Sequence, residues 1–203
     1  DSGNDDFSIE LFANDLLSLM DALKIDKTIL CGFSMGGYIA LNAIENHPER
    51  FNSLILCDTN CTADDREAKE KRTKSIESIK LNGLEQYADE SLKKLFSPIS
   101  LSKKTEEIAL VREMIIKTST ESVCKTLLAL AKRKETCSRL HEITVPVLIL
   151  VGNEDEITAP NVAIAMHEKI KSSTIHIIEN AGHLSNMENP EQSSSSSRTR
   201  LLL

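Results

Sequence analysis

Apolar runs and helix-like segments alternate along the chain, and their order limits the folds that the chain can adopt. KTILCGF (27–33) and FNSLILCD (51–58) read as strands, and MGGYIALNAIENH lies between them. Strands joined by a helix through short connections run parallel, and parallel sheets carry helices on both faces. The pattern recurs with PVLILVG (146–152), a helix near 160–171 and STIHIIE (173–179). The sequence therefore predicts an α/β fold with a parallel sheet flanked by helices.

Helical patterns account for most of the remaining chain. Residues 9–24 place apolar side chains at helical spacing, and Ser8 can cap the helix that they predict. The stretch from about 62 to 140 is rich in Lys and Glu and predicts four helices, with Ser97-Pro98 as one of their connections. We therefore expect three parts: a first part of the core over 1–61, a helical insertion over 62–140 and a second part of the core over 141–192.

The last residues differ from the rest in composition. SSSSSRTRLLL has no amphipathic period, so it predicts a disordered or foreign tail over residues 193–203. Within the insertion, the basic run KEKRTK (69–74) alternates with glutamates and predicts a solvated helix face.

Composition excludes several kinds of partner. Asp and Glu number 31 against 24 Lys and Arg, so nucleic acid is not an expected partner. No apolar run is long enough to span a membrane, and no signal-peptide pattern opens the printed chain. The five cysteines are odd in number and form no CxxC pair, which predicts reduced, buried thiols. We therefore expect a cytoplasmic protein that binds neither nucleic acid nor membranes.

One serine lies among glycines directly after the first predicted strand. Gly32-Phe33-Ser34-Met35-Gly36 matches the G-x-S-x-G pattern, in which a sharp strand-to-helix turn exposes a nucleophilic serine. The alternative is a plain tight turn, where glycine is also the usual residue. The strand–turn–helix context favours a nucleophile at Ser34. The amide of Met35 would then point toward an oxyanion.

Two further polar residues follow later strands. Asp155 lies just after the run 146–152, and His183 follows the run 173–179. Ligands of open α/β sheets bind at the carboxyl ends of the strands, so both side chains are candidates for the same site as Ser34. There a carboxylate can hold a histidine in the tautomer that activates a serine. Asp58 also ends a strand and is the alternative acid, although such a residue more often caps a turn.

The remaining histidines give no sign of a metal site. His47, His141, His167 and His176 have no metal-ligand spacing with one another or with cysteine. We therefore expect no metal and no organic cofactor.

Three motifs together resemble the α/β-hydrolase family, of the single-domain esterase and lactonase type. They are TILCGFSMGGYIAL, VPVLILVGNEDEITAP and ENAGHLSNMENPE, and the likeness runs from about residue 7 to 192. GFSMGGYIAL, followed by LILCDTN and a helical insertion, is similar to 3-oxoadipate enol-lactonases and their esterase relatives. By this resemblance, Ser34, Asp155 and His183 are a catalytic triad in the family's chain order, and the insertion is a cap that selects substrate.

The resemblance implies a serine hydrolase that cleaves a small carboxylic ester or lactone, of a kind that the motifs do not specify. C–C bond hydrolysis or perhydrolysis by the same triad stays open, and so does a non-catalytic remnant of a hydrolase. Family members carry three or four strands before the serine, with a loop that supplies a second oxyanion amide, whereas 33 residues precede Ser34 here. We therefore expect a truncated chain that lacks this donor and self-associates through a bare sheet edge.

Overall fold

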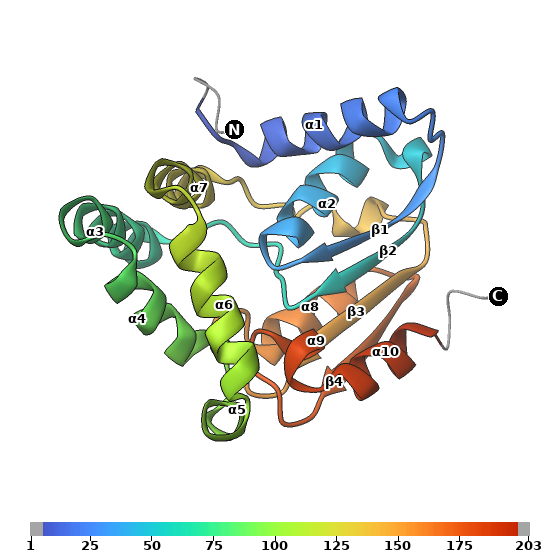
Figure 1. The fold of residues 1–203 in the computed structure, drawn as a ribbon. Helices are drawn as coiled ribbons and strands as arrows, with labels where there is room; N and C mark the ends of the chain where they lie inside the picture. Colours follow the sequence, from blue (N-terminus) through green and yellow to red (C-terminus); the bar gives the residue numbers. More distant parts are fainter. Residues whose placement is uncertain (1–5, 199–203) are drawn as a thin grey trace.

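The computed structural model describes residues 6–198, in which helices flank one four-stranded sheet (Figure 1). The strands are β1 (Thr28–Phe33), β2 (Phe51–Cys57), β3 (Val147–Gly152) and β4 (Ser173–Ile178). The α-helices are α1 (Ile9–Ala22), α2 (Met35–Asn46), α3 (Arg66–Asn82), α4 (Glu85–Leu95), α5 (Pro98–Lys103), α6 (Thr105–Lys117), α7 (Thr120–Lys132), α8 (Pro160–Lys169), α9 (Ser185–Glu188) and α10 (Pro190–Arg198). Two short 3₁₀ helices are η1 (Pro48–Arg50) and η2 (Leu140–Glu142).

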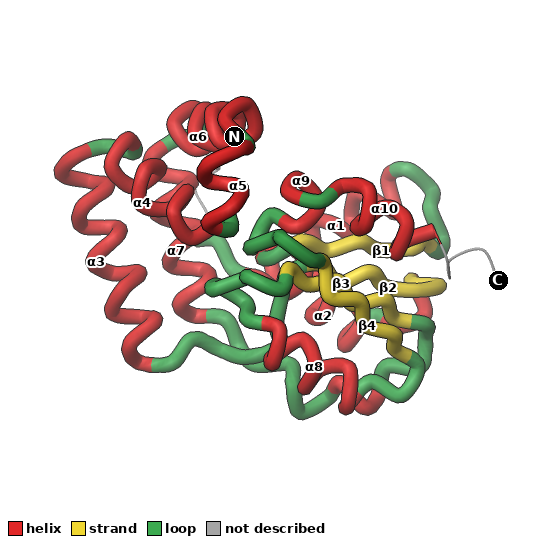
Figure 2. Tube along the Cα trace, turned by 90° about the horizontal axis from the view of Figure 1, so that it is seen from below, coloured by secondary structure: helices red, strands yellow, loops and turns green. Residues whose placement is uncertain are grey.

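The sheet has the order β1-β2-β3-β4, and every neighbouring pair is parallel. The predicted α/β fold with a parallel sheet is therefore confirmed. The carboxyl ends of the strands point toward the helices α3–α7, which gather at that end of the sheet (Figures 1 and 2). Any side chain that follows a strand accordingly lies between the sheet and these helices.

The two faces of the sheet are covered unequally. One face packs with α1, α2 and α8 into the larger core cluster, to which Leu54, Leu56 and Ile149 contribute. The opposite face holds a smaller cluster that includes Ile55, Leu148 and Ile178. Successive residues of a strand point to opposite faces, so these apolar strands supply both clusters.

The edge of the sheet at β1 is open in the part of the chain that the structure describes. Within residues 6–198, β1 pairs with β2 alone. Ile29 is 46% exposed and Cys31 is exposed, whereas Leu30 packs against the larger core. An apolar strip of β1 therefore faces solvent beside a row of unpaired backbone groups.

The insertion between β2 and β3 contains five α-helices, one more than the sequence predicted. The extra helix is α5, which begins where a simple connection was expected. Ser97 accepts a hydrogen bond from the Ser100 amide as its N-cap, and Pro98 occupies the first helical position. Proline is favourable there because its missing N–H would have no partner in the helix.

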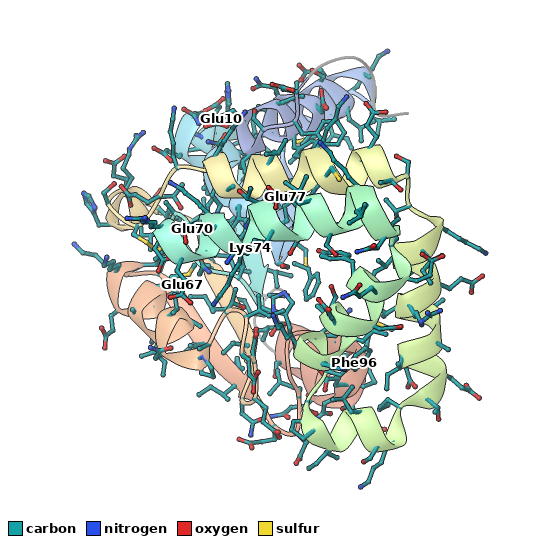
Figure 3. All side chains as sticks on the ribbon, turned by 90° about the vertical axis from the view of Figure 1, so that its left-hand side faces the viewer. Glu10, Glu67, Glu70, Lys74, Glu77 and Phe96 are labelled. Atoms are coloured by element: carbon teal, nitrogen blue, oxygen red, sulfur yellow. A yellow bond between two sulfur atoms is a disulfide. The ribbon has the colours of Figure 1, made fainter. Side chains whose placement is uncertain are left out.

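The outer face of α3 carries Glu67, Glu70, Lys74 and Glu77, which run along the helix in Figure 3. These side chains are exposed, as predicted for a solvated face. Arg72 is the exception, because its guanidinium turns inward and forms an ion pair with Asp64.

The expectation of a disordered tail from residue 193 is wrong for residues 193–198. These residues belong to α10, and Ser193 and Ser196 are both 8% exposed. Serine is only a moderate helix former, but Pro190 starts the helix and Asn189 Oδ1 accepts a hydrogen bond from the Gln192 amide. Residues 199–203 lie outside the described part of the chain.

The expectation of reduced, buried cysteines is confirmed for Cys57 and Cys124, which are free and buried, but it is wrong for Cys31, which is free and exposed, and for Cys61 and Cys137. Cys61 and Cys137 form a disulfide across 76 residues of sequence, and their Cα atoms are 4.9 Å apart. The Thr136 amide donates to the Cys61 carbonyl at 2.8 Å, so these two segments lie side by side. The disulfide therefore joins the two ends of the insertion. It also removes the part of the argument for a cytoplasmic location that rested on reduced thiols.

A buried ionic contact lies beside this disulfide. Arg133 Nη1 donates to Asp64 Oδ1 at 2.6 Å, and both side chains are 5% exposed. The same guanidinium lies 4.4 Å from the ring centre of Tyr38, which belongs to α2. The disulfide and the ion pair thus join the two ends of the insertion to each other, and the cation–π contact with Tyr38 joins them to α2 of the core.

Among residues 6–198, no helix has both the length and the apolar character that crossing a membrane would require.

Candidate active site

Ser34 lies at the sharp turn between β1 and α2. Its φ of 49° and ψ of −114° place it in a region that residues with a side chain rarely adopt. Three backbone contacts hold this conformation: the Ser34 amide donates to Cys57 O at 2.9 Å, and Ser34 O accepts from Thr59 Oγ1 at 2.8 Å and from the Gly37 amide at 2.9 Å. A strained serine held in this way is typical of functional turns.

Glycines are required on both sides of the serine. The G-x-S-x-G motif names Gly32 and Gly36, but the close contacts occur at Gly32 and Gly37. A Cβ at Gly32 would lie 2.4 Å from the carbonyl oxygen of Gly36, so only glycine fits there. A Cβ at Gly36 would meet nothing within 4 Å. At Gly37 it would lie 2.3 Å from Thr59 Oγ1, so Gly37 makes room for the threonine that holds the turn.

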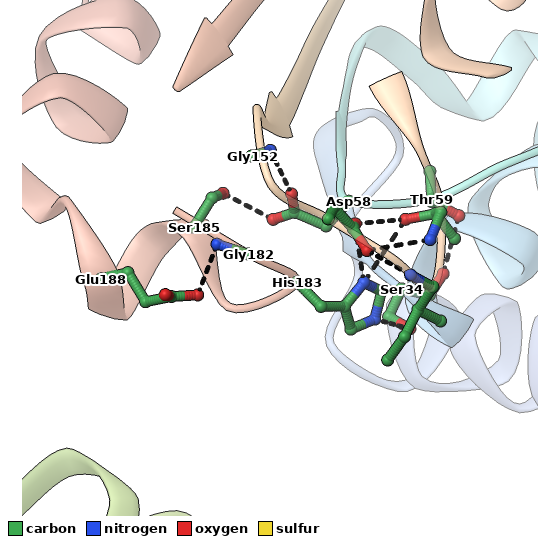
Figure 4. A network of polar contacts seen from close by, with 11 residues as sticks. Ser34, Asp58, Thr59, Gly152, Gly182, His183, Ser185 and Glu188 are labelled. Carbon is green, nitrogen blue, oxygen red and sulfur yellow. Dashed lines mark hydrogen bonds and ion pairs between the residues drawn. The ribbon is translucent and has the colours of Figure 1, made fainter. Parts of the chain in front are cut away.

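His183 connects Ser34 to Asp155 through two hydrogen bonds. His183 Nε2 lies 2.8 Å from Ser34 Oγ, and His183 Nδ1 lies 2.8 Å from Asp155 Oδ2 (Figure 4). A carboxylate can only accept, so Nδ1 carries the proton and Nε2 accepts from the serine hydroxyl. Ser34 is half-buried, whereas His183 is 2% and Asp155 3% exposed. The structure thus brings together the three residues that the sequence singled out.

The loop after β3 fixes the carboxylate of Asp155. Its Oδ1 accepts from the amides of Ile157 and Thr158 at 2.7 and 2.9 Å, and its Oδ2 accepts from Thr158 Oγ1 at 2.6 Å. Burial would raise the pKa of Asp155, but the hydrogen bond and charge of His183 and the bonds from Thr158 outweigh burial and lower it. Asp155 is therefore ionised at neutral pH. Thr158, which completes this arrangement, was not identified from the sequence.

Asp58, the alternative acid, makes different contacts. Its Oδ1 accepts from the Gly152 amide at 2.9 Å, and its Oδ2 accepts from Ser185 Oγ at 2.5 Å (Figure 4). Asp58 is 0% exposed, and burial raises its pKa to about 7, against the opposing effect of these two bonds. Asp58 thus joins the end of β3 to the segment that follows His183. The hydrogen bond to His183 Nδ1 comes from Asp155 instead.

Glu188 is a third buried carboxylate near the histidine, after Asp155 and Asp58. It is 6% exposed, and its two oxygens accept from the amides of Gly182 and Ser97, each at 2.8 Å. Neither Glu188 nor Ser185 was selected from the sequence, because nothing in the local pattern distinguishes them from surface residues. Only their burial and their distant partners reveal them.

Met35 is the first residue of α2 and follows Ser34 directly. The first amides of a helix have no acceptor within the helix, so the Met35 N–H can donate to another group. In the part of the chain that the structure describes, no group of three or more His, Cys, Asp or Glu side chains is arranged to hold a metal ion.

Comparison with protein families gives one match over nearly the whole chain. The model of the alpha/beta hydrolase fold matches residues 1–190. Among curated relatives, 3-oxoadipate enol-lactonase 2 of Acinetobacter baylyi is 28% identical over 185 residues, which are 91% of this chain and 67% of the relative. This chain therefore spans about two thirds of that protein's length.

Solved structures give the same result. A thermophilic esterase from Thermogutta terrifontis superposes with a TM-score of 0.90 and 34% identity, over 95% of this chain and 71% of the esterase. The enol-lactonase from Burkholderia xenovorans superposes with a TM-score of 0.85, over 94% of this chain and 71% of the other. At 24% identity, this second likeness concerns the fold alone.

Proposed function

Because this chain belongs to the α/β-hydrolase family, we propose that it hydrolyses a carboxylic ester or lactone through Ser34, His183 and Asp155. One observation carries the proposal: the two 2.8 Å hydrogen bonds that connect the three side chains in series. The likeness to an enol-lactonase and to an esterase supports the substrate class.

In the proposed reaction, Ser34 Oγ attacks the carbonyl carbon while His183 Nε2 accepts the hydroxyl proton. The ionised Asp155 stabilises the imidazolium that forms and keeps Nδ1 protonated. The tetrahedral intermediate then collapses, and His183 returns the proton to the leaving alkoxide. In a lactone the leaving oxygen stays attached to the acyl group. Water then attacks the acyl-serine while His183 Nε2 accepts its proton. His183 returns this proton to Ser34 Oγ as the carboxylic acid leaves.

The developing oxyanion needs hydrogen-bond donors. The Met35 amide is the donor that the proposal assigns, since it follows Ser34 at the start of α2. One such donor lowers the barrier by about 3 kcal/mol in characterised enzymes.

We assign the helices α3–α7 the role of a cap over this site. They lie beyond the carboxyl ends of the strands (Figure 2), and Ser34, Asp155 and His183 each follow one of these ends. Substrates of open α/β sheets bind at this edge, so the cap would form the other wall of the binding site.

The proposal is tested with p-nitrophenyl acetate and a simple lactone, followed by absorbance and by pH-stat titration. We expect hydrolysis by the wild-type chain and background rates for Ser34→Ala. The control is Ser18→Ala, an exposed serine of α1, which should behave as wild type. Hydrolysis of neither substrate, or equal rates for Ser34→Ala and wild type, would contradict the proposal. The first of these results would favour a chain without catalytic activity.

A further inference from the structure

The segment that joins α4 to α5 lies directly against the loop that carries His183. The Leu184 amide donates to the Leu95 carbonyl at 3.2 Å. Gly182 approaches the same segment so closely that a Cβ there would lie 2.8 Å from the Ser97 nitrogen. Phe96, labelled in Figure 3 at the end of α4, shares a buried cluster with Leu184. The helical insertion thus contacts the residues on both sides of His183.

Glu188 is the strongest of these links because it binds both partners at once. One carboxylate oxygen accepts from the Gly182 amide of the histidine loop, and the other accepts from the Ser97 amide of the insertion. Ser97 and Glu188 are 91 residues apart in the chain. A buried carboxylate is tolerated only where hydrogen bonds compensate for its lost hydration, and here these two amides provide them.

We propose that Glu188 is a positioning residue that couples the insertion to His183, so that the insertion must be docked for His183 to reach Ser34. The inference rests on the proposed function, in which His183 is the base. Removing the Ser97 contact would leave one oxygen of a buried carboxylate without a donor, and the histidine loop would shift to restore its hydration.

A backbone substitution tests the link without changing Glu188 itself. Ser97 has φ −63° and ψ 155°, and Phe96 before it is extended, with φ −109° and ψ 146°. Proline and its preceding residue adopt these angles, so Ser97→Pro removes the N–H without forcing the backbone to change. Ser97→Ala is the matched control, because it loses the same hydroxyl cap of α5 but keeps the N–H.

We expect Ser97→Pro and Glu188→Gln each to lower kcat for p-nitrophenyl acetate at least tenfold, with KM within about twofold of wild type. An unchanged KM would show that the substrate still binds normally, so a loss of kcat at unchanged KM reports on His183. Ser97→Ala should keep kcat within about twofold. The double variant should be no slower than the slower single variant, since both changes remove one interaction.

Hydrogen exchange gives a readout that needs no turnover. In Ser97→Pro, the amides of residues 182–185 should exchange at least tenfold faster than in Ser97→Ala, while those of α8 stay unchanged. The proposal is overturned if Ser97→Pro keeps wild-type kcat and exchange, or if the two variants have additive effects. If the wild-type chain hydrolyses neither the ester nor the lactone, the proposed function fails, and the exchange data alone decide the coupling.

Discussion

Asp58 and Ser185 are joined by a 2.5 Å hydrogen bond from Ser185 Oγ to Asp58 Oδ2, across 127 residues of sequence. Asp58 also accepts a hydrogen bond from the Gly152 amide at the end of β3, just before the loop that carries Asp155. The carboxyl of Asp58 therefore connects the end of β3 with the segment after His183, although it does not take the place of Asp155. Because Asp58 is fully buried, its ionisation affects the stability of the whole arrangement.

The raised pKa of Asp58 predicts a loss of stability as pH rises. Its pKa is about 7 in the folded chain, against an ordinary value of 3.8, mainly because of burial. Between these values the folded state binds more protons than the unfolded state, so the free energy of unfolding falls as pH rises, by about 4 kcal/mol at most. Asp58→Asn keeps a neutral side chain of similar shape and should abolish this part of the dependence.

Urea unfolding at pH 4.5, 5.5, 6.5 and 7.5 checks this prediction. Two neighbouring charges also affect the pKa of Asp58: the charge of His183 lowers it, and the charge of Asp155 raises it. Asp155, whose pKa is lowered, changes the free energy of unfolding in the opposite direction. It stabilises the folded chain at higher pH, and this stabilisation is lost only as pH falls below about 4. The difference between wild type and variant therefore isolates Asp58 in this window. Parallel curves for the two proteins would show that Asp58 does not titrate as described.

Asp155→Asn should reduce kcat for ester hydrolysis by roughly 10³- to 10⁴-fold. The amide would donate toward His183 Nδ1 and favour the tautomer that cannot accept the serine proton. Glu156→Gln is the control, because Glu156 is exposed in the same loop. This substitution should lower kcat less than threefold. Steady-state kinetics of both variants check the assignment. If Asp58→Asn caused the larger loss instead, the acid would be Asp58.

Removing the Cys61–Cys137 disulfide should lower the free energy of unfolding by about 4 kcal/mol, the chain-entropy estimate for a loop of this length. The double change Cys61→Ser with Cys137→Ser would be compared with wild type by urea unfolding, with and without dithiothreitol. The reductant should bring wild type to the stability of the variant and leave the variant unchanged. Equal stability of the oxidised wild type and the variant would contradict the prediction.

The open edge of β1 predicts self-association of the 203-residue chain. Ile29→Lys places a charge on the exposed strip beside the unpaired edge and should shift the chain toward monomer, because charged residues on an edge strand oppose pairing. Leu81→Lys is the control: Leu81 is 84% exposed but lies on α3, away from the edge. Size-exclusion chromatography with light scattering measures both. A wild-type monomer, or equal effects of the two variants, would contradict the prediction.

Much of the sheet and the convergence of the site residues could be predicted from local pattern. Ser34, Asp155 and His183 each follow an apolar strand, and the carboxyl ends of parallel strands meet at one edge. This reasoning needs only the order of elements along the chain. It does not depend on how the helices of the insertion pack.

Other features depend on contacts between distant segments, which a single sequence does not encode in any local pattern. The contact of Glu188 with Ser97 and the Cys61–Cys137 bond are of this kind. The helix α10 was missed because its serine-rich composition suggested disorder, whereas its packing and its first residues stabilise it. The motif indicates Gly36 as the required glycine, whereas the structure requires Gly37, because the motif does not reveal which glycine faces Thr59.

Mapping the site of covalent labelling tests whether His183 activates Ser34 as a nucleophile. The chain is treated with a small fluorophosphonate, and the modified residue is located by peptide mass spectrometry. We expect one phosphonyl group on Ser34, and no labelling at that peptide in Ser34→Ala or His183→Ala. Labelling of another residue, or undiminished labelling of Ser34 in His183→Ala, would contradict the proposal that His183 activates Ser34.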